Sequence, residues 1–363
     1  MKNTFGQSVT VTLFGESHGA EIGAVVDGLA PGISVDEEFI RHQLSLRRPM
    51  KDGLSTSRAE ADPFRIVSGV FEGKTTGTPI CILIPNGDTR SKDYTPAIPR
   101  PGHADYAAEC KYHGFQDYRG GGHFSGRITA ALVAAGAIVI SALREKGILI
   151  GTHIASLAGE KDRAFGDLDA DLKALGEMTF PVLDASSSEK MKQKIRDAAA
   201  DCDSVGGILE TLVKGIPAGV GEPWFDTVEG VLAHALFSVP AIKGVEFGAG
   251  FAFADLRGSE ANDPIAIKDG CVSMLTNQNG GINGGITNGM PLVFRCAVKP
   301  TPSIAKEQDS VDLARMENVK LSIHGRHDPA VIHRARVVVD SVTAFALCDL
   351  LAQRFGTDFL REK

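Results

Sequence analysis

The feature that most constrains the fold of this chain is a glycine-rich turn that leads directly into a long apolar segment. The turn, Asp117–Thr129, reads DYRGGGHFSGRIT, and the apolar segment runs from Ile128 to Leu143. This segment is shorter than the roughly 20 residues that cross a bilayer, and it is rich in alanine and glycine. We therefore predict a core helix that other elements surround, and no membrane association.

The same glycine-rich turn predicts an anion-binding site. Glycines let a backbone approach a ligand closely, and the start of a helix offers free N–H groups to an anion. Arg119 and Arg127 add positive charge on either side of the glycines. The alternative is a flexible turn that Ser125 caps, with both arginines in solvent.

Composition and charge limit what the whole chain can be. Its 363 residues allow one large domain or two smaller ones, and 43% hydrophobic with 23% charged residues is typical of a soluble globular protein. The net charge of −7 argues against a nucleic-acid binder, so an anion site must be a local basic pocket. Six scattered cysteines and an amino-terminal sequence unlike a signal peptide indicate a cytoplasmic protein.

Hydrophobic periodicity predicts a mixture of strands and helices. The strands are Val9–Phe14, Ile22–Val26, Phe64–Phe71, Pro79–Ile84, Ile148–Ala155, Gly207–Gly215, Val245–Phe253, Leu292–Val298 and Arg336–Asp340. The helices are Val35–Leu46, Asp105–Tyr112, Ser125–Lys146, Ser188–Asp201, Asp226–Phe237 and Ser341–Arg354. Strands follow one another as often as they alternate with helices, which favours a layered α+β fold. The similar order before and after about Lys146 suggests a single domain, 1–363, built of two related halves.

Two segments imitate nucleotide-binding loops without matching them. Gly69–Thr75 resembles a P-loop, but its glycines are one residue too close and a strand follows instead of a helix. Gly73 and Gly77 are expected to turn a hairpin. Gly248–Gly250 lacks the third glycine of a dinucleotide-binding loop. Neither segment predicts ATP or dinucleotide binding.

Several further turns carry one functional side chain each. GESHG exposes His18 and RPGHAD exposes His103, and such histidines can transfer protons near neutral pH, although each alone is equally consistent with an ordinary surface histidine. Lys299 and its hydroxyl neighbours suit phosphate oxygens, and Asp328 in GRHDP could act as a base. The loop Gly280–Gly285 could lie against a flat ring or simply be a tight turn.

A metal site is the competing interpretation near the carboxyl end. His324, His327, Asp328 and His333 lie within ten positions and are common ligand types. Their spacing matches no zinc signature, and Pro329 interrupts a ligand-bearing helix. We therefore expect no metal, and keep a metal-assisted phosphohydrolase as an alternative.

Taken together, these blocks resemble the chorismate synthase family over nearly the whole chain. The blocks, in the order of the family, are GESHG, RRP at Arg47–Pro49, EGKTTGTPI at Glu72–Ile80, RPGHAD, the RGGG turn, GxxGGI around Gly281–Ile286, VKPTPSI and GRHDP. The resemblance implies elimination of phosphate from 5-enolpyruvylshikimate 3-phosphate to give chorismate, with reduced FMN as cofactor, which NADPH reduces in some members. It also implies layered sheets around a core of long helices, and a homotetramer.

The resemblance also implies roles for individual residues. His103 would protonate the leaving phosphate, His18 would act on the reduced flavin, and Asp328 would help to remove the ring hydrogen. The implied FMN contacts are His123, Phe124, Ser125, Ala241, Gly284, Lys299, Pro300, Thr301, Pro302, Ser303 and Arg326. The implied substrate contacts are Arg47, Arg48, Arg127 and Arg334.

The sequence departs from the family pattern in three places. HFSGRI at His123–Ile128 replaces the usual RSSARE, the stretch after Arg48 differs, and Pro240 stands where asparagine is frequent. A catalytically silent relative that binds flavin or phosphate is therefore a second alternative.

Overall fold

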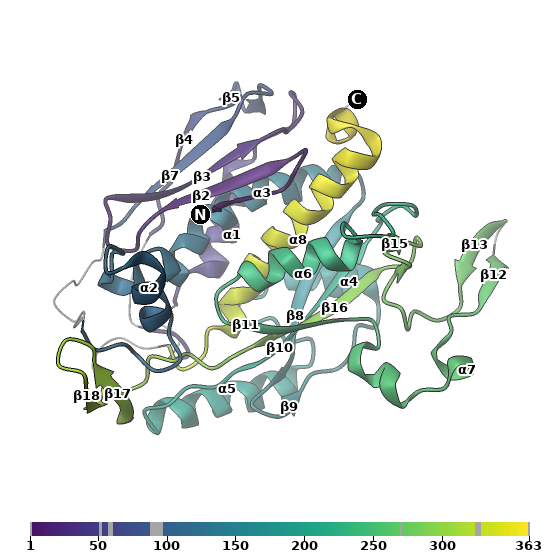
Figure 1. Cartoon of the computed structure of the whole chain (residues 1–363). Coiled ribbons are helices and arrows are strands. Elements are labelled where there is room, and N and C mark those ends of the chain that lie inside the picture. Colours follow the sequence, from purple (N-terminus) through teal and green to yellow (C-terminus); the bar gives the residue numbers. More distant parts are fainter. Residues whose placement is uncertain are drawn as a thin grey trace.

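The computed structural model describes residues 2–50, 53–56, 61–87, 97–268, 270–323 and 328–361. Two five-stranded sheets, antiparallel throughout, enclose a layer of helices (Figure 1). The first sheet has the order β1 (Thr4–Phe5), β2 (Thr10–Gly15), β3 (Glu21–Asp27), β7 (Ile80–Pro85) and β4 (Arg65–Ser68). The second has the order β11 (Ile242–Phe247), β16 (Leu292–Val298), β10 (Gly207–Lys214), β8 (Leu149–Leu157) and β9 (Glu160–Lys161).

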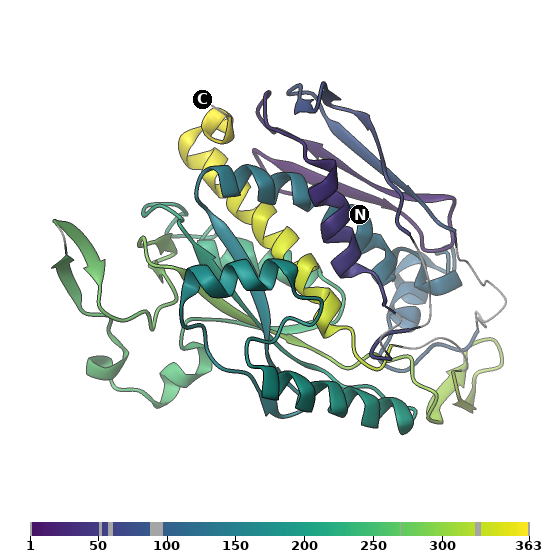
Figure 2. The ribbon, with the colours of Figure 1, turned by 180° about the vertical axis from the view of Figure 1, so that it is seen from behind.

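The helices divide into an inner layer and a peripheral set (Figure 2). The inner layer consists of α1 (Glu37–Arg47), α3 (Thr129–Glu145), α6 (Val228–Ser238) and α8 (Ile332–Phe355). The others are α2 (Asp105–Tyr112), α4 (Leu168–Glu177), α5 (Ala185–Ala200) and α7 (Gly258–Ala261). Each sheet turns one apolar face inward, as β7 does with Ile80, Ile82 and Ile84, all almost fully buried. The predicted layered α+β fold is therefore confirmed.

Short hairpins extend from this framework. They are β5 (Val70–Phe71) with β6 (Lys74–Thr75), β12 (Ile265–Lys268) with β13 (Cys271–Met274), β14 (Ile282–Asn283) with β15 (Ile286–Thr287), and β17 (Gln308–Asp312) with β18 (Glu317–Leu321). Gly73, with φ +75°, turns the first of them, as predicted for the segment that imitates a P-loop. The β12–β13 hairpin and α7 project away from the rest of the molecule in both views (Figures 1 and 2).

The apolar segment after the glycine turn is the predicted core helix. In α3 the described side chains from Thr129 to Leu143 are buried, with the single exception of Ser141, which is partly exposed. Among the described residues, Gly126–Glu145 is a candidate membrane span by length and hydropathy, yet 89% of its apolar window is buried inside the protein. Its neighbour is α8, and the two helices are in close contact where Gly136 meets Ser341, since a Cβ at Gly136 would lie 2.5 Å from that of Ser341.

Several sequence-based assignments are wrong. Arg336–Asp340 is not a strand, because it lies inside α8, where the β-branched run is buried on all sides and gives no usable periodicity. The strand expected at Val245–Phe253 ends at Phe247, and the strand expected at Phe64–Phe71 breaks at Gly69, with φ +83°. Helix α4 was not predicted. The proposed relation of the two halves about residue 146 stays a prediction.

Candidate active site

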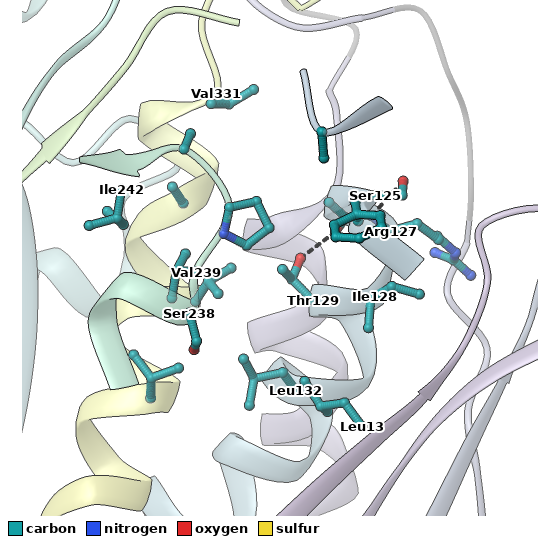
Figure 3. A pocket seen from close by; sticks show the side chains of 18 of the residues that line it. Leu13, Ser125, Arg127, Ile128, Thr129, Leu132, Ser238, Val239, Ile242 and Val331 are labelled. Atoms are coloured by element: carbon teal, nitrogen blue, oxygen red, sulfur yellow. Dashed lines mark hydrogen bonds between the residues drawn. The ribbon is translucent and has the colours of Figure 1, made fainter. Parts of the chain in front are cut away.

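A cavity of about 1030 Å³ lies where the first sheet, α3, the end of α6 and the start of α8 meet. One part is apolar: Leu132 of α3 and Ile128, which directly precedes that helix, lie opposite Val239 and Ile242, which follow α6 (Figure 3). The other part is polar and includes His103, Lys299, Asp328 and Arg334. Such a combination of apolar surface with a few convergent polar groups is typical of a small-molecule site.

The glycine turn brings the two predicted histidines together. Gly120, Gly121 and Gly122 all have positive φ, at 61°, 83° and 53°, a region that side chains disfavour. A Cβ at Gly120 would lie 2.6 Å from Nε2 of His18, and one at Gly121 would lie 3.2 Å from Cε1 of His103. Both histidines therefore pack directly against this turn, and any side chain at Gly120 would displace the His18 ring.

His103 is oriented by Asp105, which Arg100 of the same segment holds in place. Its Nδ1 lies 2.6 Å from Oδ1 of Asp105 and 3.0 Å from a guanidinium nitrogen of Arg100. A guanidinium can only donate, so the shorter contact to the carboxylate indicates that Nδ1–H donates to Asp105. Burial opposes ionisation of Asp105, but hydrogen bonds from Arg100 and His103 outweigh it and hold the pKa of the carboxyl far below its usual range. The Nε2 atom of His103 is thereby left for proton transfer.

Asp328 is held on a different wall of the cavity. Its Oδ1 accepts a hydrogen bond of 2.9 Å from the backbone N–H of Thr56 and lies 2.6 Å from a guanidinium nitrogen of Arg334. Arg334 in turn donates to the carbonyl of Arg47 at 3.4 Å. Two donors on one oxygen fix the orientation of the carboxylate.

Arg47 and Arg127 share a buried acidic partner. Arg127 bonds to Asp62, to Asn86 at 2.9 Å and to the carbonyl of Pro85 at 3.0 Å. Arg47 donates to the carbonyl of Gly126 at 3.1 Å, and its guanidinium lies 3.6 Å from Asp62. Both arginines line the cavity, but their guanidinium groups are largely engaged by protein groups. The solvated alternative for the glycine turn is therefore wrong for Arg127, whereas the side chain of Arg119 pairs with Asp117 and stays 42% exposed.

The residues expected to bind FMN are mostly at the cavity. His123, Phe124, Ser125, Ala241, Lys299, Thr301, Pro302 and Ser303 line it. Ser125 is also a helix cap, since its hydroxyl accepts a hydrogen bond from the N–H of Arg127 at 3.2 Å. Pro300 is adjacent to lining residues, whereas Gly284 lies in the β14–β15 turn outside the cavity lining. Arg326 lies outside the described residues.

The remaining predicted positions are more scattered. His18 contacts Gly120 but does not itself line the cavity. Arg48 donates to the carbonyl of Ala61 at 2.9 Å. Of the suggested metal ligands, His324 and His327 lie outside the described residues, and no group of three potential ligands occurs within the part that is described.

Sequence reasoning missed the residues that support the site. Asp105 lies within the RPGHAD block and could have been found as the carboxylate two positions after His103. Asp62 and Thr56 are in a stretch without a recognisable motif, and only the fold brings them to Arg127 and Asp328.

Helices enclosed by two antiparallel sheets, with imidazole, carboxylate and guanidinium groups around one cavity, define an enzyme that acts on a small anionic molecule. The chorismate synthase family model matches residues 9–352. Chorismate synthases from Korarchaeum cryptofilum and Thermococcus kodakarensis are 46% and 44% identical, covering 95% and 96% of this chain and 96% and 97% of theirs. A solved structure titled "Crystal Structure of Chorismate Synthase" superposes with a TM-score of 0.74 at 29% identity, covering 98% of this chain and 94% of its own. The chain belongs to the chorismate synthase family, and is a lyase.

Proposed function

We propose that this chain eliminates phosphate and a ring hydrogen from 5-enolpyruvylshikimate 3-phosphate to give chorismate. The observation that carries the proposal is that motifs more than 200 positions apart in the chain, around His103 and Asp328, meet at one cavity. An acid and a base on separate walls suit a reaction in which phosphate leaves one part of a ring and a proton leaves another. Family membership does not favour the phosphohydrolase alternative.

The cavity suits reduced FMN as the cofactor. The Thr301 hydroxyl is buried without a hydrogen-bond partner among the described residues, and Lys299 and Ser303 lie beside it in the lining, so this segment fits a phosphate. The apolar part around Leu132 and Ile242 fits a flat aromatic ring. When bound, the reduced flavin supplies electron density to the substrate as phosphate leaves and recovers it as the ring hydrogen departs.

The residues of the chain divide the proton transfers between them. His103, held through Nδ1 by Asp105, donates a proton from Nε2 to the leaving phosphate and so lowers the cost of its developing charge. Asp328, with Oδ1 engaged by Thr56 and Arg334, accepts the proton that leaves the ring. His18, behind Gly120, holds a proton for the cofactor.

Positive charge in the cavity binds the anionic substrate. The substrate carries one phosphate and two carboxylates, and the chain as a whole is acidic, with net charge −7. Arg334, Arg47 and Arg127 line the cavity, and Asp62 holds Arg127 in place, whereas Arg48 is bonded to the carbonyl of Ala61 and would have to turn to reach the substrate. Neutralisation by these arginines keeps the substrate at the acid and the base.

We propose that the chain assembles into a homotetramer, and its exposed apolar surface supports self-association. Phe225, Trp224 and Phe251 are 93%, 76% and 84% exposed, and Ile265 and Ile267 are exposed on the projecting β12–β13 hairpin. Large aromatic side chains in water are typical of protein interfaces.

All six cysteines are free thiols, which suits the cytoplasm.

An anaerobic assay with chemically reduced FMN tests the function. We expect chorismate, detected by the absorbance of its new diene, with one phosphate released per turnover. Phosphate release without the diene would identify a hydrolase, and binding of flavin without turnover would identify a catalytically silent relative. Either result would refute the proposal.

A further inference from the structure

His333 is a buried side chain that the proposed reaction does not use. It lies in the first turn of α8 with 1% of its surface exposed, and its ring packs against Phe180 with the ring centres 5.7 Å apart. Its Nε2 lies 3.0 Å from the hydroxyl oxygen of Ser55, and its Nδ1 has no hydrogen-bond partner among the described residues. Among the described residues, the ring therefore has its one hydrogen-bonding contact with a segment 278 positions away.

That segment, 53–56, also holds Asp328. Thr56 follows Ser55 directly, and its backbone N–H donates to Oδ1 of Asp328 at 2.9 Å. Leu54 on the other side of Ser55 is 4% exposed and belongs to the core. The Ser55 contact thus lies one residue from the amide that orients the carboxylate.

The two consecutive residues His333 and Arg334 consequently act on Asp328 by different routes. Arg334 reaches Oδ1 directly, at 2.6 Å. His333 reaches it through Ser55 and the Thr56 amide. Both routes start from the first turn of α8, so the helix fixes the carboxylate from two directions.

We propose that Ser55 and His333 form a positioning pair that places the Thr56 amide on Asp328 and so sets the orientation of the base. The inference rests on the proposed role of Asp328. The hydrogen bond requires a neutral ring if the hydroxyl is to donate to Nε2, and burial lowers the pKa of His333 to about 3, with the charge of Arg334 adding to the effect. The pair is therefore intact at the pH at which the enzyme works.

Removal of the Ser55 hydroxyl tests the pair with little disturbance of packing. In Ser55→Ala we expect kcat for chorismate formation to fall about tenfold, the equivalent of one hydrogen bond, with KM and the Kd for reduced FMN unchanged. With substrate deuterated at the departing ring position, the isotope effect on kcat should rise, because the proton-transfer step is slowed selectively. Ser55→Thr keeps a hydroxyl and should restore most of the rate.

His333→Phe removes the other partner while retaining a ring against Phe180. The fall in kcat should match that of Ser55→Ala. The double variant should be no slower than either single variant, as expected for residues that act as a unit. Ser45→Ala is the matched control, since Ser45 is a half-buried serine that donates to the carbonyl of His42 on α1, away from the cavity lining. It should leave kcat and the isotope effect unchanged.

Two results would overturn the pairing. One is a Ser55→Ala enzyme with kcat within twofold of the parent and the same isotope effect. The other is a double variant in which the two single reductions in kcat multiply, as for independent residues. Asp328→Asn separates this failure from failure of the proposed function. If Asp328→Asn is inactive and Ser55→Ala is normal, only the pairing is wrong, whereas an active Asp328→Asn removes the assignment of the base itself.

Discussion

The wall of the cavity that carries His103 and the wall that carries Asp328 are held in different ways. His103 is oriented by Asp105, which Arg100 holds in turn, and all three belong to the same six-residue block. Asp328 is oriented by Thr56, which is 272 positions away, and by Arg334, whose guanidinium also reaches the carbonyl of Arg47. One wall is local in the sequence, and the other is assembled by the fold.

The two walls should therefore be sensitive to different changes in the protein. The wall that carries His103 depends on the hydrogen bonds within its own segment and on the glycine turn against which His103 packs. An assembled wall depends in addition on the relative positions of the segment 53–56, α1 and α8. Changes in the packing of the helical layer should therefore reach Asp328 and leave His103 in place.

The largest effect should come from removing the acid or the base. We expect His103→Ala and Asp328→Ala each to lower kcat by about 10²- to 10⁴-fold, the usual contribution of general acid or base catalysis. Anaerobic turnover and flavin fluorescence would be measured, and FMN binding should be largely retained. Asp197→Ala, on the exposed face of α5, is the control. Near-normal turnover in both site variants would show that these walls do not carry the chemistry.

A second change separates the local wall from the assembled one. In Asp105→Asn the neutral amide no longer secures the Nδ1–H of His103 or the Arg100 guanidinium, so we expect kcat to fall about a hundredfold through misplacement of the acid. Only the step that expels phosphate should slow, so the isotope effect of the deuterated substrate should fall towards unity. An increased isotope effect would mean that the two walls are coupled.

The contrast between the walls also explains what the sequence could predict. His18 and His103 lie in short turns of glycine and proline, and the positive φ angles of Gly120 and Gly121 let both rings approach the backbone, so the motifs predicted two histidines that the fold does place at one turn. The core helix after the turn could also be predicted, because its apolar run has no polar face. These signals are all contained in contiguous sequence.

The rest depends on contacts that no local pattern records. Thr56 meets Asp328, and Asp62 meets Arg127, only because the inner helices bring distant loops together. The start of α8 was mistaken for a strand because its β-branched residues are buried on every side, and burial removes the periodicity that distinguishes a helix.

A packing change in the helical layer should have a moderate effect, and it should fall on the assembled wall. In Gly136→Ala the new methyl group would lie 2.5 Å from Cβ and 3.0 Å from Cα of Ser341, so α3 and α8 must separate. We expect a loss of about 1–3 kcal/mol in the free energy of unfolding, measured with denaturant, despite the better helix propensity of alanine. In Gly176→Ala, where the added Cβ in α4 meets nothing within 4 Å, stability should stay the same or increase. Equal stability of the two variants would contradict the close contact.

Mild acid should weaken the two walls at different pH, with a small effect just below neutral pH. Because the pKa of His333 is lowered to about 3 from 6.5, the unfolded chain binds a proton there that the folded protein does not. Above pH 6.5 the His333 ring is neutral in both states and does not lower the free energy of unfolding. Below pH 6.5 that free energy falls by at most about 1.4 kcal/mol per pH unit because of this group. The pKa of Asp105 is also depressed, so its contribution is lost only below about pH 3.8.

The difference between the parent and His333→Phe isolates the assembled wall, because other groups act in the same range. His153 is one: hydrogen bonds from its ring to Asp162 and Glu210 outweigh its burial and raise its pKa, so it favours the folded state as the pH falls. The contribution of His153 is the same in the parent and in His333→Phe, so it cancels in the difference between their free energies of unfolding. Unfolding free energies measured between about pH 7 and 4.5 should therefore converge as the pH falls, with the parent losing stability more steeply. Parallel curves would show that protonation of the His333 ring costs no stability, and would contradict the prediction.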